Sequence, residues 1–146
     1  MLRPLLTAFA LGAALLSPAK ADDRQAKPLV TIVTSPEPQT QLMAMVLTMQ
    51  AVQQGASAHI LLCGPGGDLA LNEAPEGATA PQKPRNASPQ GLLRKIMETG
   101  TPVEVCAIYL PNKGADPDVL LDGITVAKPP AMAAKLLEDD ARILSF

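Results

Sequence analysis

The sequence has 146 residues, of which 47% are hydrophobic and only 2% aromatic, and it contains no tryptophan. This length suits a single domain with an aliphatic core. Two cysteines and one histidine exclude a scaffold built from several disulfides and argue against a histidine-rich metal site. The formal net charge of −2 and the scarcity of aromatic residues argue against nucleic-acid binding, which uses basic surfaces and stacking side chains.

The first 21 residues have the pattern of a secretory signal peptide. Arg3 precedes an apolar stretch over residues 5–16, and residues 19–21 read Ala-Lys-Ala, a small-x-small cleavage site. The apolar stretch is shorter than the roughly 20 residues that span a bilayer. We therefore expect residues 1–21 to be removed, leaving a domain over residues 22–146 with no membrane association. The mature protein is expected to be exported, and periplasmic if its source is a Gram-negative bacterium.

The first half of this domain alternates strand and helix patterns. A β-branched run over residues 29–34 predicts a strand, which the prolines that follow it terminate. Residues 39–54 change to helical spacing. Residues 58–63 predict a second strand, whose almost continuous apolar character suits a sheet covered on both faces. The predicted apolar stripe of the helix consists of Leu42, Met45, Val46, Met49 and Val52.

The middle of the chain contains a proline-rich segment over residues 72–89, which predicts a surface loop. A short helix is expected over residues 92–99, with Gly100 past its end. An apolar run over residues 103–110 predicts the third strand. The two halves of the domain are thus joined through an exposed connection.

The last part of the chain completes the pattern. Residues 118–121 predict a helical turn, residues 124–127 a short strand, residues 129–139 a helix and residues 142–146 a fifth strand. Strands that alternate with helices at this spacing imply a parallel sheet with helices on both faces. The predicted fold class is a three-layer α/β sandwich around a mostly parallel five-stranded sheet.

The two cysteines fall where such folds place their chemistry, at the carboxyl ends of strands. Cys63 ends the second predicted strand, and Cys106 lies near the carboxyl end of the third. A thiolate on Cys106 is a candidate nucleophile, with Lys113 nearby to favour the ionised form. The alternative is that Cys106 packs as a small hydrophobic residue.

The chain resembles the DsrE/DsrF-like family over about residues 28–146. The resemblance rests on a strand ending in Val-Glu-Val-Cys106, a glycine eight residues further on, and the run from Asp118 to Ala127 before the last helix and strand. It implies a flavodoxin-like sandwich that assembles as a trimer or hexamer. It also implies a persulfide on the cysteine after the third strand, which Cys106 matches. Some relatives have a second cysteine three residues later, where this chain has Tyr109.

Three functions follow as hypotheses. The first is an exported DsrE-like sulfur carrier that forms a persulfide on Cys106 and passes the sulfur to the thiol of a partner protein. The second is a non-catalytic oligomeric module that is structural or binds a small ligand. The third is a thiol-redox protein that uses Cys63 with Cys106. Whether the protein is an enzyme therefore stays open, and if it is active the expected reaction is sulfur transfer.

A disulfide between the cysteines is disfavoured if the strands follow the flavodoxin order. That order places the first strand between the second and third, and two strand spacings are about 9.5 Å. Bridged cysteines keep their α-carbons within about 7 Å. Cys63 is then expected to be a half-buried free thiol.

Other motifs predict structure rather than chemistry. The Gly64-Pro-Gly-Gly67 segment lacks the spacing of a phosphate-binding loop and predicts a tight turn. Met45 and Met49 lie on a predicted apolar stripe, which favours core packing over copper binding. His59 has no ligand partner at a characteristic spacing. No cofactor and no metal ion are expected.

Overall fold

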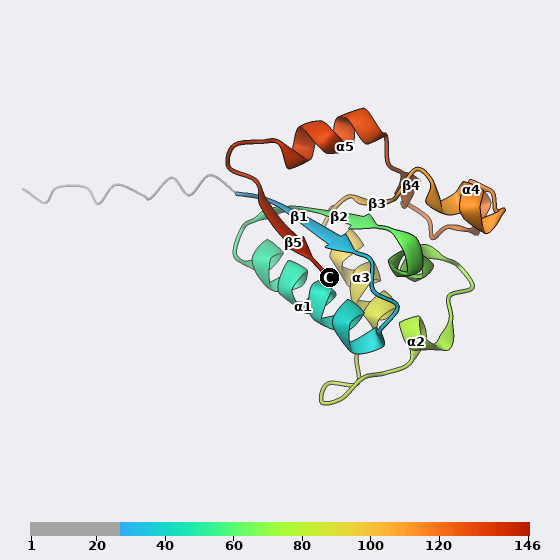
Figure 1. The fold of residues 1–146 in the computed structure, drawn as a ribbon. Coiled ribbons are helices and arrows are strands. Elements are labelled where there is room, and N and C mark those ends of the chain that lie inside the picture. The colour runs from blue at the N-terminus through green and yellow to red at the C-terminus, as the bar shows by residue number, and fades with distance from the viewer. Residues whose placement is uncertain (1–26) are drawn as a thin grey trace, which may run out of the picture.

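The computed structural model describes residues 27–146, so the predicted signal peptide lies outside the described residues (Figure 1). Five strands form one sheet in the order β4-β3-β2-β1-β5, and every neighbouring pair is parallel. The predicted parallel sheet is therefore confirmed. The strands are β1 (Pro28–Val33), β2 (Ser57–Leu62), β3 (Val103–Val105), β4 (Thr125–Val126) and β5 (Arg142–Ser145).

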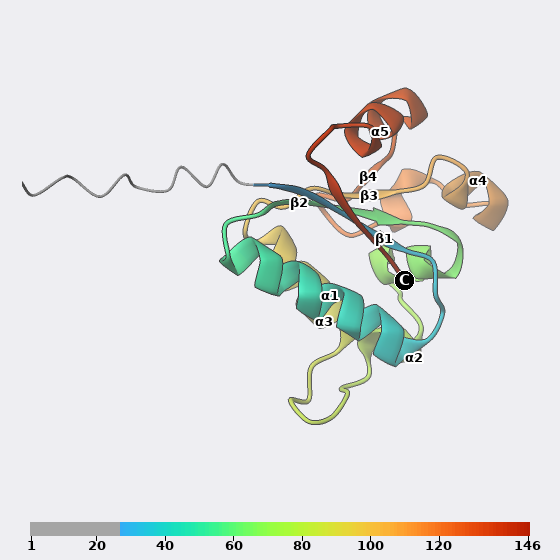
Figure 2. The same cartoon turned by 60° about the vertical axis from the view of Figure 1, so that its left-hand side comes forward.

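Helices cover both faces of the sheet, which confirms the three-layer sandwich. Helices α1 (Pro38–Gln53) and α3 (Pro89–Met97) lie against one face, and α5 (Pro129–Leu136) lies over the other (Figures 1 and 2). The remaining helical segments are α2 (Glu76–Thr79), α4 (Tyr109–Lys113) and the 3₁₀ turns η1 (Gly64–Ala70) and η2 (Pro117–Val119).

Alternate residues of the strands supply two separate apolar clusters. The larger cluster joins Ile60 and Leu62 of β2 to Met45 of α1 and to Leu93 and Ile96 of α3, all of them fully buried. The smaller cluster lies on the face under α5 and consists of Val30, Leu61, Ala127 and Met132. Burial on both faces explains why β2 is almost continuously apolar.

Helix α1 begins at a carboxylate cap. Glu37 accepts a hydrogen bond from the backbone N–H of Thr40 at 2.7 Å. This bond, with a second one from the N–H of Gln39, lowers the pKa of Glu37 because it stabilises the ionised form. Pro38 occupies the first turn, where its missing N–H costs nothing.

The buried side of α1 is rotated from the predicted stripe. The fully covered residues include Thr48 and Met45, whereas Leu42 and Val46 are only half-buried. Thr48 turns inward because its hydroxyl lies 2.7 Å from the hydroxyl of Thr31 in β1 and donates to the Ala44 carbonyl. A polar pair satisfied inside the core therefore replaces part of the apolar stripe.

Two segments differ in detail from the sequence pattern. Strand β3 ends at Val105 rather than continuing to residue 110, because the backbone turns after Cys106 and the Tyr109 N–H donates to the Cys106 carbonyl. The proline-rich segment over residues 72–89 contains the short helix α2 and an isolated bridge between Gln82 and Ala87. Among the described residues, no helix is long and apolar enough to cross a membrane.

Candidate functional site

The sheet brings the two cysteines together. Strands β2 and β3 are neighbours, and their parallel register pairs Leu62 with Val105. Cys63 and Cys106 are the next residues on each strand, so they lie side by side with α-carbons 5.1 Å apart and form a disulfide. Neither cysteine is therefore a free thiol in this structure.

The strand order corrects the argument that separated these cysteines. The flavodoxin order would insert β1 between β2 and β3, but here β2 lies between β1 and β3. The cysteines are consequently one strand spacing apart instead of two, which is within the reach of a disulfide. The expectation that Cys63 is a free thiol is therefore wrong in this structure.

The disulfide lies at the carboxyl edge of the sheet, on the face that α5 covers. Both cysteines are half-buried, and both pack against the smaller apolar cluster, which includes Met132 of α5. The Cys63 N–H donates to the Val33 carbonyl, and the Cys106 N–H donates to the Leu62 carbonyl, each at 2.9 Å. The sheet thus holds the N–H group of each cysteine, whereas the carbonyl of each cysteine accepts from the turn that follows it.

The glycine segment after Cys63 forms η1, a 3₁₀ turn that packs closely on the sheet. The Gly66 N–H donates to the Cys63 carbonyl at 3.0 Å. A side chain on Gly66 would clash with the Val33 carbonyl, and one on Gly67 would clash with the Tyr109 ring. These glycines are therefore needed for close packing, a role consistent with the predicted turn.

Three side chains connect the segments that follow the two cysteines. Asp68 of η1 accepts a hydrogen bond from the Tyr109 hydroxyl at 2.6 Å and another from the Lys113 ammonium at 3.0 Å. We refer to Asp68, Tyr109 and Lys113 as the Asp68 cluster. Burial and the bond to Asp68 both raise the pKa of Tyr109, so its phenol stays protonated and acts as a donor.

The Asp68 cluster was not predicted from the sequence. Asp68 and Tyr109 are separated by 41 positions, and neither belongs to a motif. Lys113 was predicted to stabilise a Cys106 thiolate, but its ammonium forms an ion pair with Asp68. A role for Lys113 at the sulfur stays a prediction.

His59 is buried on β2, on the same face of the sheet as Cys63, and lies beside β3. Its Nε2 atom lies 2.8 Å from the Glu104 carboxylate. The pKa of His59 is lowered, mainly because burial disfavours its charged form. The hydrogen bond and the charge of Glu104 act in the opposite direction, and the positive charge of Lys135 lowers the pKa further. The pair is a structural cross-strand contact, as the sequence predicted for His59.

Stability is expected to fall in acid because of His59. Its folded-state pKa lies below the ordinary value of 6.5, so the unfolded chain binds a proton first. The contribution of His59 is present above pH 6.5 and is lost progressively below it. Urea denaturation should therefore show a steeper loss of unfolding free energy from about pH 7.5 to about pH 5.5 in the wild type than in His59→Gln. Equal slopes in the two proteins would contradict this assignment.

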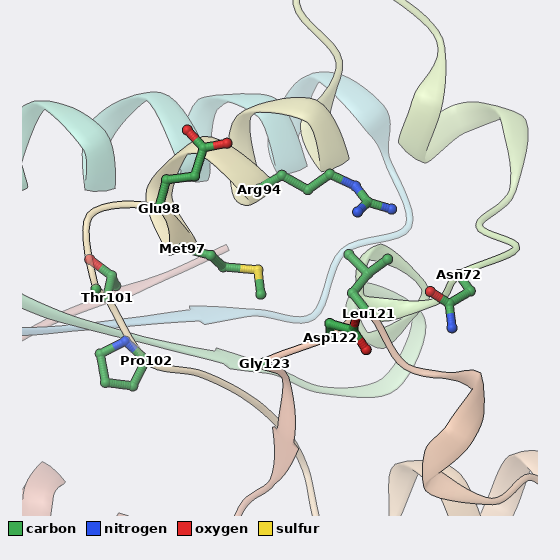
Figure 3. Close-up of a pocket in the computed structure, with 10 residues that line it drawn as sticks. Asn72, Arg94, Met97, Glu98, Thr101, Pro102, Leu121, Asp122 and Gly123 are labelled. Carbon is green, nitrogen blue, oxygen red and sulfur yellow. The ribbon is translucent and has the colours of Figure 1, made fainter.

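A surface cavity of about 830 Å³ opens at the end of the sheet opposite the disulfide. Figure 3 shows Met97 and Arg94 of α3 on one side of it, and Leu121 and Asp122 on the other. Its wall includes Pro102 and Gly123, which precede β3 and β4, so the cavity lies at the amino ends of these strands. The disulfide is at the carboxyl ends of β2 and β3, and the cavity is therefore a separate feature.

The part of the chain that the structure describes contains no group of three or more His, Cys, Asp or Glu side chains placed to hold a metal ion. Met45 is fully buried and Met49 packs against the larger apolar cluster, so both serve as core residues.

The fold and the site define a parallel α/β protein with a cysteine pair at the carboxyl edge of its sheet. Two of the solved structures that share this fold are YchN and MTH1491. YchN from E. coli has a TM-score of 0.66 at 17% identity, covering 84% of this chain and 100% of its own. MTH1491 from Methanobacterium thermoautotrophicum, a protein of unknown function, has a TM-score of 0.61 at 10% identity with the same coverage of both chains.

The chain therefore shares the parallel α/β fold of these two proteins. At these identities the likeness concerns the fold alone. No protein-family model matches the sequence. No curated protein matches it either.

Proposed function

We propose that the protein is a thiol–disulfide exchange protein whose redox-active pair is Cys63 and Cys106. The observation that carries this proposal is the disulfide between neighbouring parallel strands at the carboxyl edge of the sheet. Both cysteines are half-buried rather than sealed in the core, which leaves the sulfurs within reach of an incoming thiolate. The proposal develops the third of the functions that the sequence allowed.

The exchange proceeds in two displacements. A thiolate of a partner dithiol attacks one sulfur of the Cys63–Cys106 bond, forming a mixed disulfide and releasing the other cysteine as a thiolate that takes up a proton. The second partner thiolate then attacks the mixed disulfide, forming the partner's disulfide and releasing the remaining cysteine. The partner loses two electrons and two protons, and the cysteine pair gains them.

A second candidate function is sulfur transfer through Cys106, because Cys106 directly follows β3 in a DsrE/DsrF-like fold. In the reduced protein, the Cys106 thiolate would attack a sulfane donor, take its outer sulfur as a persulfide and release the donor thiolate. Cys63 limits the lifetime of this persulfide. Its thiolate would attack the inner sulfur, form the Cys63–Cys106 disulfide and release sulfide. The wild type is therefore a poorer sulfur carrier than a protein with Cys106 alone.

The test combines redox titration with intact mass. The folded wild type is equilibrated with graded mixtures of reduced and oxidised glutathione, and its thiols are trapped by alkylation. We expect a reversible two-electron transition between the disulfide and a folded dithiol. A disulfide that stays oxidised in every mixture in which the protein remains folded would overturn the exchange proposal and favour a non-catalytic module.

Sulfane sulfur separates the two candidates. Reduced wild type, Cys63→Ser and Cys106→Ser are each mixed with inorganic polysulfide. If the protein is a thiol–disulfide exchange protein, any persulfide on Cys106 is short-lived in the wild type, which should release sulfide and re-form its disulfide. Cys63→Ser should instead gain the mass of one sulfur atom. A stable added sulfur on the wild type, lost only in Cys106→Ser, would favour the carrier.

The cellular setting is part of the proposal. The signal-like segment over residues 1–21 supports export, and an oxidising compartment would maintain the disulfide. We also propose a thiol-bearing protein as partner and a homo-oligomer, trimeric or hexameric as the family resemblance implies. The intact mass of the exported protein tests the first point, since cleavage predicts a chain that begins at Asp22. Native mass spectrometry measures the number of subunits.

A further inference from the structure

The segments after the two cysteines are joined at two places. One connection is the disulfide, and the other is the Asp68 cluster, in which Asp68 from the β2 side binds Tyr109 and Lys113 from the β3 side. The second connection contains no sulfur, so it does not depend on the oxidation state of the cysteines. Reduction would break the first and leave the second in place.

Each half of the Asp68 cluster is tied to its own cysteine through the backbone. The Cys63 carbonyl accepts from the N–H of Gly66, which lies in the turn that carries Asp68. The Cys106 carbonyl accepts from the N–H of Tyr109 at 2.8 Å. A shift of Asp68 would therefore move the turn that follows Cys63, and a shift of Tyr109 would move the turn that follows Cys106.

The tyrosine is well held in this arrangement. Its ring is buried at 8% exposure and lies against Gly67, and the Lys113 ammonium lies 5.7 Å from the ring centroid. Asp68 receives both donors on one carboxylate oxygen, and hydrogen bonds to a charged acceptor are among the stronger ones in proteins. The contact is thus a defined bond network rather than a loose surface ion pair.

We propose that Asp68, Tyr109 and Lys113 are positioning residues that keep the Cys63 and Cys106 thiols together in the reduced protein. The inference rests on the proposed thiol–disulfide function. Holding two thiols close raises their effective concentration toward each other and favours disulfide formation. Weakening the cluster allows the two turns to separate when the sulfur bond is broken, which favours the dithiol.

The test measures the disulfide–dithiol equilibrium against glutathione, in which two glutathione thiols are oxidised as the protein disulfide is reduced. Tyr109→Phe removes the donor while keeping the ring on Gly67. Lys113→Ala removes the second donor from a more exposed position, and Lys95→Ala removes an exposed lysine of α3 as a matched control. For Tyr109→Phe we expect the equilibrium constant for disulfide formation to fall about tenfold, a shift of about 30 mV.

Lys113→Ala should shift the equilibrium in the same direction by less, and Lys95→Ala should retain the wild-type value. A purely structural role would lower the melting temperature of the oxidised and reduced forms alike and leave the equilibrium unchanged. Wild-type constants in both Tyr109→Phe and Lys113→Ala would overturn the positioning role. A wild-type disulfide that never equilibrates while folded would instead overturn the proposed function, so the two failures are distinct.

Discussion

Reduction of the Cys63–Cys106 disulfide is expected to lower the free energy of unfolding by about 4 kcal/mol. The bond closes a loop between residues 43 positions apart, and its removal returns that loop's conformational freedom to the unfolded chain. For a domain of this size, the loss corresponds to a fall in melting temperature of roughly 12–16 °C. Calorimetry with and without a reductant measures the effect directly.

The serine variants provide the matched comparison. Cys63→Ser and Cys106→Ser should each melt close to the reduced wild type, and addition of reductant should leave their melting temperatures unchanged. A small difference between the oxidised and reduced wild type, below about 1 kcal/mol, would contradict the expectation. It would mean that the unfolded chain already holds the two segments together.

The second large effect is expected for Gly66→Ala. The added methyl group would meet the Val33 carbonyl, which is part of the sheet and unable to move aside as a flexible side chain does. We expect a loss of about 3 kcal/mol of stability, because η1 must shift away from β1. The same shift would disturb the hydrogen bond from Gly66 to the Cys63 carbonyl.

Gly64→Ala distinguishes this clash from a general intolerance of the turn. Gly64 has a φ of +51° but open space around its missing side chain. Alanine there has only the cost of the left-handed backbone, about 1 kcal/mol. Urea denaturation of both variants should therefore rank Gly66→Ala as the more destabilised. The reverse order would contradict the packing argument.

Strand and helix positions were predictable because their patterns are local. The β-branched run that forms β1 and the apolar run that forms β2 each report the burial of that segment alone. The inward turn of Thr48 was not predictable, since it depends on a hydroxyl partner in another strand. The early end of β3 was not predictable either. The backbone turns after Cys106, but the apolar run continues past that point and is typical of an extended strand.

The candidate site was predictable in its residues and not in its geometry. Cys63 and Cys106 stood out because strand ends in parallel sheets are where functional groups gather. Their pairing depended on strand order, which the alternation of elements leaves open, and the assumed order led to the wrong distance. Asp68 and Tyr109 carry no local signal, because what makes them a site is a contact between turns far apart in sequence.

Helix α5, which covers the cysteine face of the sheet, has a consequence for kinetics. Helix α5 has eight residues, and Met132 is its one buried residue. Such a helix is expected to open at a lower free energy than the β1–β2 centre of the sheet, so local unfolding of α5 would expose the half-buried sulfurs further while the sheet stays intact. Attack by a thiolate is then expected to be faster on molecules in which α5 is open than on those in which it is closed. Hydrogen exchange at the Met132 amide, which donates to the Lys128 carbonyl, would read the same opening without any thiol present.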